Sequence, residues 1–144
     1  MPVKTIPEGY HTVTPLLAVK GAERLIDFLK AAFGATEISK LSAENGTVMH
    51  AELKIGDSMV MLGEAMENCP AMPASLYLYV TDADATFRTA LDAGAESLES
   101  PTDQFWGDRV AFVRDYAGNK WWIATHKEDV DANEIARRVQ AKAA

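Results

Sequence analysis

The sequence predicts an α+β fold of two βαβββ modules and a C-terminal helix, in which curved mixed sheets surround a cavity. Three observations support this prediction. One apolar helical stripe ends at Gly34, and a second ends at Gly94, about 60 residues later. Strand-like segments follow each glycine, which indicates a structural repeat. The 144 residues are enough for one domain, 1–144, with a buried core.

The first module is expected at residues 10–64. It opens with a strand at 10–20, in which Pro15 indicates an edge position or a bulge. The helix that follows has apolar residues at the spacing of one buried stripe: Leu25, Phe28, Leu29, Ala32 and Phe33. Asn45-Gly46 indicates a hairpin turn. The remaining strands are expected at 35–44, 47–55 and 58–63.

The second module is expected at residues 75–126. A strand at 75–80 leads to a helix that Asp82 caps and Gly94 ends. Residues 101–108 are typical of a loop or an irregular edge. The later strands are expected at 95–100, 109–114 and 120–126, and the C-terminal helix at 129–141. Sheet faces that no helix covers should curve around the cavity between the modules.

Composition excludes several classes of function. The net charge is −7, so binding to nucleic acid is not expected, although local cations could hold an anionic small molecule. Cys69 is the only cysteine, which rules out an internal disulfide and favours a reducing compartment. No apolar run is long enough to span a membrane, and the first residues do not resemble a signal peptide. We therefore expect a cytoplasmic protein.

His50 and Glu52 are the first candidate functional residues. They lie two positions apart on a predicted strand, so they share a face. One interpretation is an acid–base pair or a ligand anchor, because histidine titrates near neutral pH. The other is the polar face of a half-exposed strand.

The segment 103–109 is the densest polar and aromatic cluster: Asp103, Gln104, Phe105, Trp106, Gly107, Asp108 and Arg109. Its glutamine and arginine could bind a carboxylate, carbonyl or phosphoryl oxygen, and its two aromatic rings could stack on a flat ligand. Alternatively, its charges satisfy the loop backbone and its rings pack beneath the loop.

The order of elements, together with several phrases, resembles the vicinal-oxygen-chelate (glyoxalase/bleomycin-resistance/dioxygenase) superfamily, and most closely its PhnB-like branch. The phrases are Thr14-Pro15-Leu16-Leu17, Ala32-Phe33-Gly34-Ala35, Met49-His50-Ala51-Glu52-Leu53, residues 103–109, and Val113-Arg114-Asp115 with Gly118. The resemblance covers about residues 8–130. It implies eight strands in two modules and, commonly, a homodimer.

The resemblance also implies a divalent metal ion in metal-dependent relatives, held by His, Gln or Glu on four strands. Those positions fall here at Thr14, Met61, Ser75 and Trp122. None is a usual ligand of a catalytic divalent ion, so we expect no metal cofactor. Tyr77 and Tyr79 share the face of Ser75, and with Trp122 they predict an aromatic lining. Trp122 either stacks on a ligand or fills the space of the metal.

The sequence supports two functions about equally. The first is a small-molecule-binding protein of the bleomycin-resistance type, which holds a polar or aromatic ligand in the sheet cavity without metal. The alternative is an enzyme, such as a lyase, isomerase or dioxygenase-like protein, that uses His50 and Glu52 or a relocated metal. A third possibility is that the cavity is vestigial and the dimer surface is the working part.

Overall fold

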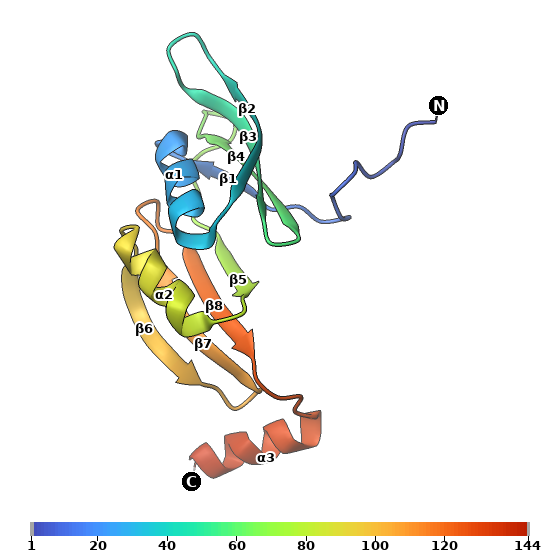
Figure 1. Ribbon diagram of the computed structural model, residues 1–144, viewed down its shortest axis with the longest axis vertical. Helices are drawn as coiled ribbons and strands as arrows, with labels where there is room; N and C mark the ends of the chain where they lie inside the picture. Colours follow the sequence, from blue (N-terminus) through green and yellow to red (C-terminus); the bar gives the residue numbers. More distant parts are fainter. Residues whose placement is uncertain (1, 144) are drawn as a thin grey trace.

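The computed structural model describes residues 2–143 and confirms the α+β architecture (Figure 1). The elements are β1 (Leu16–Val19), α1 (Ala22–Phe33), β2 (Thr36–Ser42), β3 (Val48–Ile55), β4 (Ser58–Glu64), β5 (Ser75–Tyr79), α2 (Ala83–Asp92), β6 (Glu96–Asp103), β7 (Asp108–Arg114), β8 (Lys120–His126) and α3 (Ala132–Ala143). The βαβββ order occurs twice, as the helix-ending glycines predicted. No helix within residues 2–143 is long and apolar enough to cross a membrane.

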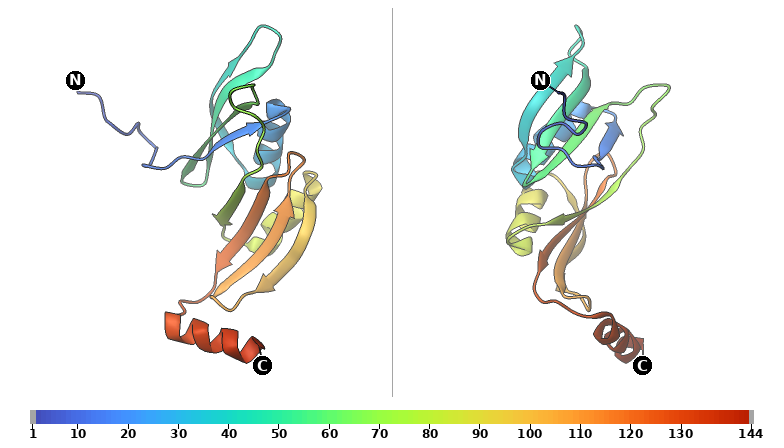
Figure 2. Two further views of the ribbon diagram at one scale, coloured as in Figure 1. Left: turned by 180° about the vertical axis from the view of Figure 1, so that it is seen from behind. Right: turned by 90° about the vertical axis from the view of Figure 1, so that its right-hand side faces the viewer.

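Each module forms a separate four-stranded sheet of mixed type. The strand orders are β1-β4-β3-β2 and β5-β8-β7-β6. In each sheet the first and last strands of the module are parallel, and the other pairs are antiparallel. The two sheets do not close on each other. Seen from behind, the sheets lie in front of α1 and α2, so both helices cover the same side of the molecule (Figure 2).

The modules meet through their helices and through aromatic residues, among them Tyr116, whose hydroxyl donates to the Lys20 and Gly21 carbonyls and whose ring lies under Arg24. Helices α1 and α2 pack against each other, and the core is continuous across both modules. The ring centroid of Phe33 lies 5.0 Å from that of Trp121, which is 1% exposed. The Trp121 indole N–H donates to Asp115 Oδ2 over 2.9 Å, so its polar atom is satisfied in the core.

Three predicted boundaries were wrong. The first strand covers only 16–19 of the expected 10–20, because Pro15 has no N–H for the ladder. Strand β6 continues through Pro101 into the expected loop, with a register irregularity between Glu99 and Thr102. Helix α3 starts at Ala132 instead of 129, after Asp131, whose carboxylate accepts the Glu134 backbone N–H over 2.8 Å.

Candidate ligand-binding site

The second sheet carries an aromatic surface on the side away from α2. We call it the aromatic face and define it by Tyr77, Tyr79, Phe112 and Trp122. The register of β5, β8 and β7 places three of these residues in one row. The Phe112 and Trp122 rings stack with centroids 3.8 Å apart at 20°, and Tyr77 lies nearly parallel to Trp122 at 6.3 Å.

Strand alternation explains how the aromatic face forms. The intervening residues Leu76, Trp121 and Val113 point to the helix side and belong to or pack against the core. Their neighbours therefore project to the opposite side, where neither α1 nor α2 packs. Tyr77 is 41% exposed and Tyr79 66% exposed. Large aromatic surface is thus open to solvent on a rigid sheet.

Asp108 organises one end of the aromatic face. It is 2% exposed, and its Oδ2 accepts hydrogen bonds from Tyr77 Oη (2.7 Å), Tyr79 Oη (3.1 Å) and Trp106 Nε1 (3.1 Å). Its Oδ1 lies 2.7 Å from Nδ1 of His126. Burial alone would raise the pKa of Asp108, but these hydrogen bonds outweigh burial and hold it below the usual value. An ionised carboxylate therefore fixes both tyrosine hydroxyls.

His126 connects Asp108 to the C-terminal segment. Its Nε2 lies 2.7 Å from Asp129 Oδ1, so the imidazole sits between two carboxylates. These hydrogen bonds, from Asp108 first and then Asp129, raise the pKa of His126. Burial, with the hydrogen bond to Asp108, raises the pKa of Tyr77 to about 12. His126 therefore bridges two carboxylates, and Tyr77 is a neutral phenol that donates to one of them.

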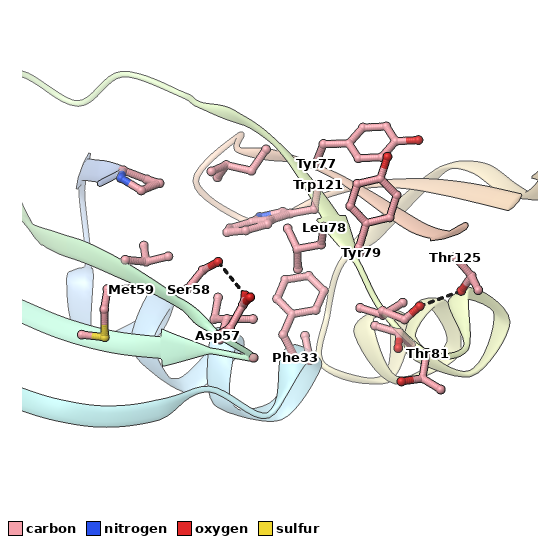
Figure 3. A pocket seen from close by; sticks show the side chains of 18 of the residues that line it. Phe33, Asp57, Ser58, Met59, Tyr77, Leu78, Tyr79, Thr81, Trp121 and Thr125 are labelled. Carbon is pink, nitrogen blue, oxygen red and sulfur yellow. Dashed lines mark hydrogen bonds between the residues drawn. The ribbon is translucent and has the colours of Figure 1, made fainter. Parts of the chain in front are cut away.

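A cleft of about 1130 Å³ runs between the modules beside the free edge of β5 (Figure 3). Phe33, Trp121 and Leu78 form its apolar wall, and Asp57 and Ser58 at the β3–β4 turn face them. The two tyrosines of the aromatic face lie at its border. The cleft and the aromatic face are therefore continuous along β5.

Arg109 is placed away from the aromatic face. Its Nε and Nη2 donate to the two carboxylate oxygens of Asp84 over 2.6 and 3.0 Å, and its Nη1 donates to Asp103 over 3.2 Å. Asp84 lies in the first turn of α2, so the guanidinium joins β7 to that helix. Because the donors are occupied on the helix side, we leave Arg109 out of the proposed site.

The other members of segment 103–109 divide between two roles. Trp106 points to the aromatic face and also donates to Tyr77 Oη over 3.1 Å. Phe105 contacts the Trp106 ring edge-on, and its carbonyl accepts a hydrogen bond from Arg138 of α3. Gln104 closes the loop through its backbone. Its N–H donates to the Asp108 carbonyl, and its carbonyl accepts the Gly107 N–H. Only Trp106 and Asp108 therefore face the candidate site.

His50 and Glu52 lie on the uncovered face of the first sheet. Register places Glu52 beside Met61, and Met61 beside Leu16. Glu52 accepts hydrogen bonds from Ser39 Oγ (2.6 Å) and from the Tyr10 hydroxyl, and these bonds lower its pKa. Within residues 2–143 no hydrogen bond joins His50 to Glu52.

The four positions at which the superfamily resemblance implies metal ligands carry side chains that are unusual ligands of a divalent ion. Thr14 precedes β1 and lies outside any strand, and Met61 offers only a thioether. Ser75 Oγ accepts the Trp122 indole N–H over 3.2 Å. In the described part of the chain, no group of three or more His, Cys, Asp or Glu side chains could hold a metal ion. These donors do not fit a divalent ion.

Sequence reasoning missed the pairing of Asp108 with His126 and the stacking of Phe112 on Trp122. The alternation of β8 already places His126 on the face of Trp122, which was the available signal. The partner strand's register could not be read from the sequence, because a shift of one residue would reverse the face.

Two βαβββ modules that leave their sheet faces open define a class of small cavity-forming proteins. The chain belongs to the Glyoxalase/Bleomycin resistance protein/Dioxygenase superfamily, which it matches over residues 10–123. It is 35% identical over 134 residues to an uncharacterized protein of Mycobacterium bovis, covering 85% of this chain and 88% of that protein.

Solved structures show the same fold. TioX from Micromonospora sp. ML1 is 28% identical, with a TM-score of 0.69 over 79% of this chain and 98% of TioX. A PhnB protein from Bacillus cereus, described as a putative 3-demethylubiquinone-9 3-methyltransferase, is 19% identical. It has a TM-score of 0.63 over 80% of this chain and 99% of that protein, a likeness of fold alone.

Proposed function

We propose that this protein binds a small planar molecule on the aromatic face and does so without a metal at the usual position of the superfamily. The observation that carries the proposal is the Phe112–Trp122 stack, with ring centroids 3.8 Å apart, on a sheet face that α1 and α2 leave open. A third ring, Tyr77, lies nearly parallel to Trp122 with the centroids 6.3 Å apart, so three aromatic rings form one row on this face. Planar ligands stack on such surfaces with favourable geometry.

The hydrogen bonds to Asp108 support this function, because they hold the tyrosines before a ligand arrives. Tyr77 and Tyr79 each donate to the same buried carboxylate. A side chain fixed in the free protein loses little conformational entropy on binding, so the face is preorganised. The continuous cleft along β5 gives the ligand room beyond the stacked rings.

The enzymatic alternative with His50 and Glu52 has less support. The hydrogen bonds from Ser39 and Tyr10 lower the pKa of Glu52, which makes its carboxylate a weaker proton acceptor near neutral pH. We therefore assign these two residues to the polar part of the uncovered face of the first sheet.

We also propose that the protein is a homodimer of the PhnB-like branch. Apolar side chains are exposed on the uncovered side of the first sheet, where Leu16 and Leu41 are each 60% exposed. A second copy that covers this face would remove that surface from water. Light scattering should give twice the chain mass for the native protein, and a monomer for Leu16→Glu. A monomeric native protein would overturn this part of the proposal.

Binding can be tested with 2-naphthamide, a flat neutral probe, by calorimetry on the full chain. We expect saturable binding that Trp122→Leu and Phe112→Leu each weaken by about tenfold, because each removes one stacking ring. Phe105→Leu removes an aromatic ring outside the face and should leave the affinity unchanged. Absence of binding, or equal affinity in all three variants, would refute the proposed function.

A further inference from the structure

We infer that the ligand of the aromatic face carries an acidic group, and that Arg114 and Lys120 bind this group. The inference rests on the proposed function and specifies its substrate class as planar aromatic carboxylates. Neither residue belongs to segment 103–109, where the sequence indicated an anion-binding arginine. The structure instead places two other cations beside the stacked rings.

Register puts the two cations next to the stack. Arg114 is directly opposite Lys120 in the β7–β8 ladder, as Phe112 is opposite Trp122. Between these two pairs lie Val113 and Trp121, which are 0% and 1% exposed and face the helix side. Arg114 and Lys120 therefore project from the same side as the rings, one side-chain row away.

The charges of this row are poorly compensated. Like charges directly opposite each other on a sheet are destabilising, yet Arg114 and Lys120 occupy such positions. Lys120 is exposed and makes no ion pair with any residue in the described range 2–143. Among the residues that the structure describes, Arg114 pairs only with Glu96, whose Oε2 lies 3.4 Å from its Nε. A bound anion would remove the repulsion.

Arg114 also has an unused donor. Its Nε is buried and has no hydrogen-bond partner within residues 2–143, because the contact with Glu96 is an ion pair without hydrogen-bonding geometry. The Arg114 side chain as a whole is 42% exposed, so other parts of it reach the surface. A buried unpaired N–H is costly, and a guanidinium fork fits the two oxygens of a carboxylate.

A cationic ligand would meet one exposed carboxylate beside the rings, Glu99, which is opposite Phe112 in the β6–β7 ladder, whereas Glu96 is already paired with Arg114. Asp108 is the buried carboxylate nearest the rings in the ladder, but four donors already satisfy it. Its charge faces His126, whose pKa the hydrogen bonds to Asp108 and Asp129 raise. A cationic ligand would therefore meet no free anion at Asp108, whereas an anionic ligand would meet two cations at the other end of the stack.

Comparing 2-naphthoate with 2-naphthamide tests the inference, because the two probes differ in charge and share one flat ring system. Calorimetry on the full chain at low ionic strength should show about tenfold tighter binding of 2-naphthoate. The preference should shrink as salt is added. In Arg114→Met/Lys120→Met, 2-naphthamide should bind as in the native protein, and the preference for 2-naphthoate should disappear.

Two further variants serve as controls. Arg88→Met removes an exposed cation from α2 and should keep the full preference. Glu96→Gln removes the competing carboxylate and should tighten 2-naphthoate binding. Lys120→Met alone, at an exposed position, keeps the test available if the double variant folds poorly.

The outcomes separate the two proposals. Binding of 2-naphthamide without any preference for 2-naphthoate would overturn the acidic-ligand inference and leave the proposed function standing. A preference that persists in the double variant would also overturn the inference. Binding of neither probe would overturn both.

Discussion

Oδ1 of Asp108 and Nδ1 of His126 lie 2.7 Å apart, and the two residues are directly opposite each other in the β7–β8 ladder. This contact joins the last strand to the aromatic face, since the other oxygen of Asp108 holds Tyr77, Tyr79 and Trp106. It also compensates a buried charge, which would otherwise be unfavourable in the sheet.

Replacing Asp108 with asparagine should destabilise the protein. Asp108→Asn removes the charge and directs an amide N–H₂ toward side chains that are themselves donors. We expect the free energy of unfolding in urea to fall by about 1–3 kcal/mol. Asp129→Asn changes the exposed partner of His126 and should cost less. Equal losses in both variants would show that Asp108 is not the centre of the network.

Stability should decrease with rising pH because of His126. Its folded pKa is raised above the ordinary 6.5, so its contribution is fully present below the unfolded pKa and is lost as pH rises through the folded value. Urea unfolding across pH 6 to 9 should therefore show the native protein losing stability relative to His126→Gln. His11→Gln, an exposed histidine outside the network, should follow the native slope. Parallel curves for native and His126→Gln proteins would contradict this role.

Arg109 should matter for folding and not for ligand binding. Arg109→Met breaks the two hydrogen bonds to Asp84 at the start of α2. We expect a lower urea midpoint, with 2-naphthamide affinity unchanged. Arg88→Met, another arginine lost near the same helix, should leave the midpoint close to the native value. A large loss of probe binding in Arg109→Met would restore this residue to the site.

Gly107 allows the C-terminal segment to approach the Trp106 loop. Its carbonyl accepts the backbone N–H groups of Lys127 (2.8 Å) and Glu128 (3.1 Å), and its φ is 102°. A Cβ there would collide with the Glu128 carbonyl, so Gly107→Ala should cost about 1–3 kcal/mol. Gly46→Ala has a similar positive φ but open space around the Cβ. The difference between the two variants in the free energy of unfolding, measured in urea, isolates the effect of the collision. Equal losses of stability would show that only the positive φ matters.

Metal content tests whether the usual position of the superfamily's metal is lost. Protein purified without chelator should contain no stoichiometric divalent ion by elemental analysis, because Met61 and Trp122 are poor ligands. EDTA should leave the melting temperature unchanged. A tightly bound equivalent of metal, or destabilisation by EDTA, would contradict the proposal.

Much of the fold could be predicted because its signals are local. The stripe from Leu25 to Phe33 and the glycines that end both helices are set by neighbours in the sequence. One error came where strand pairing overrode a local signal. Pro101 suggested a loop, but β6 continues through it with an irregular register against β7.

The candidate site was only partly predictable. Alternation along one strand placed Tyr77 and Tyr79 on one face, and the superfamily resemblance placed Trp122 with them. The position of Arg109 could not be predicted in this way, because its partner Asp84 lies 25 residues away on a helix. Local density of polar and aromatic residues in segment 103–109 could not show which side chains face the ligand.

The sequence by itself determined the duplicated module and the aromatic strands, since each depends on residue type and short-range periodicity. Only the tertiary structure decided that Asp108 is buried against His126, that Phe112 stacks on Trp122, and that Arg114 stands opposite Lys120. The physical reason is register. One residue of shift between β7 and β8 would send these side chains to the other face of the sheet, and that shift is fixed by packing across the whole module.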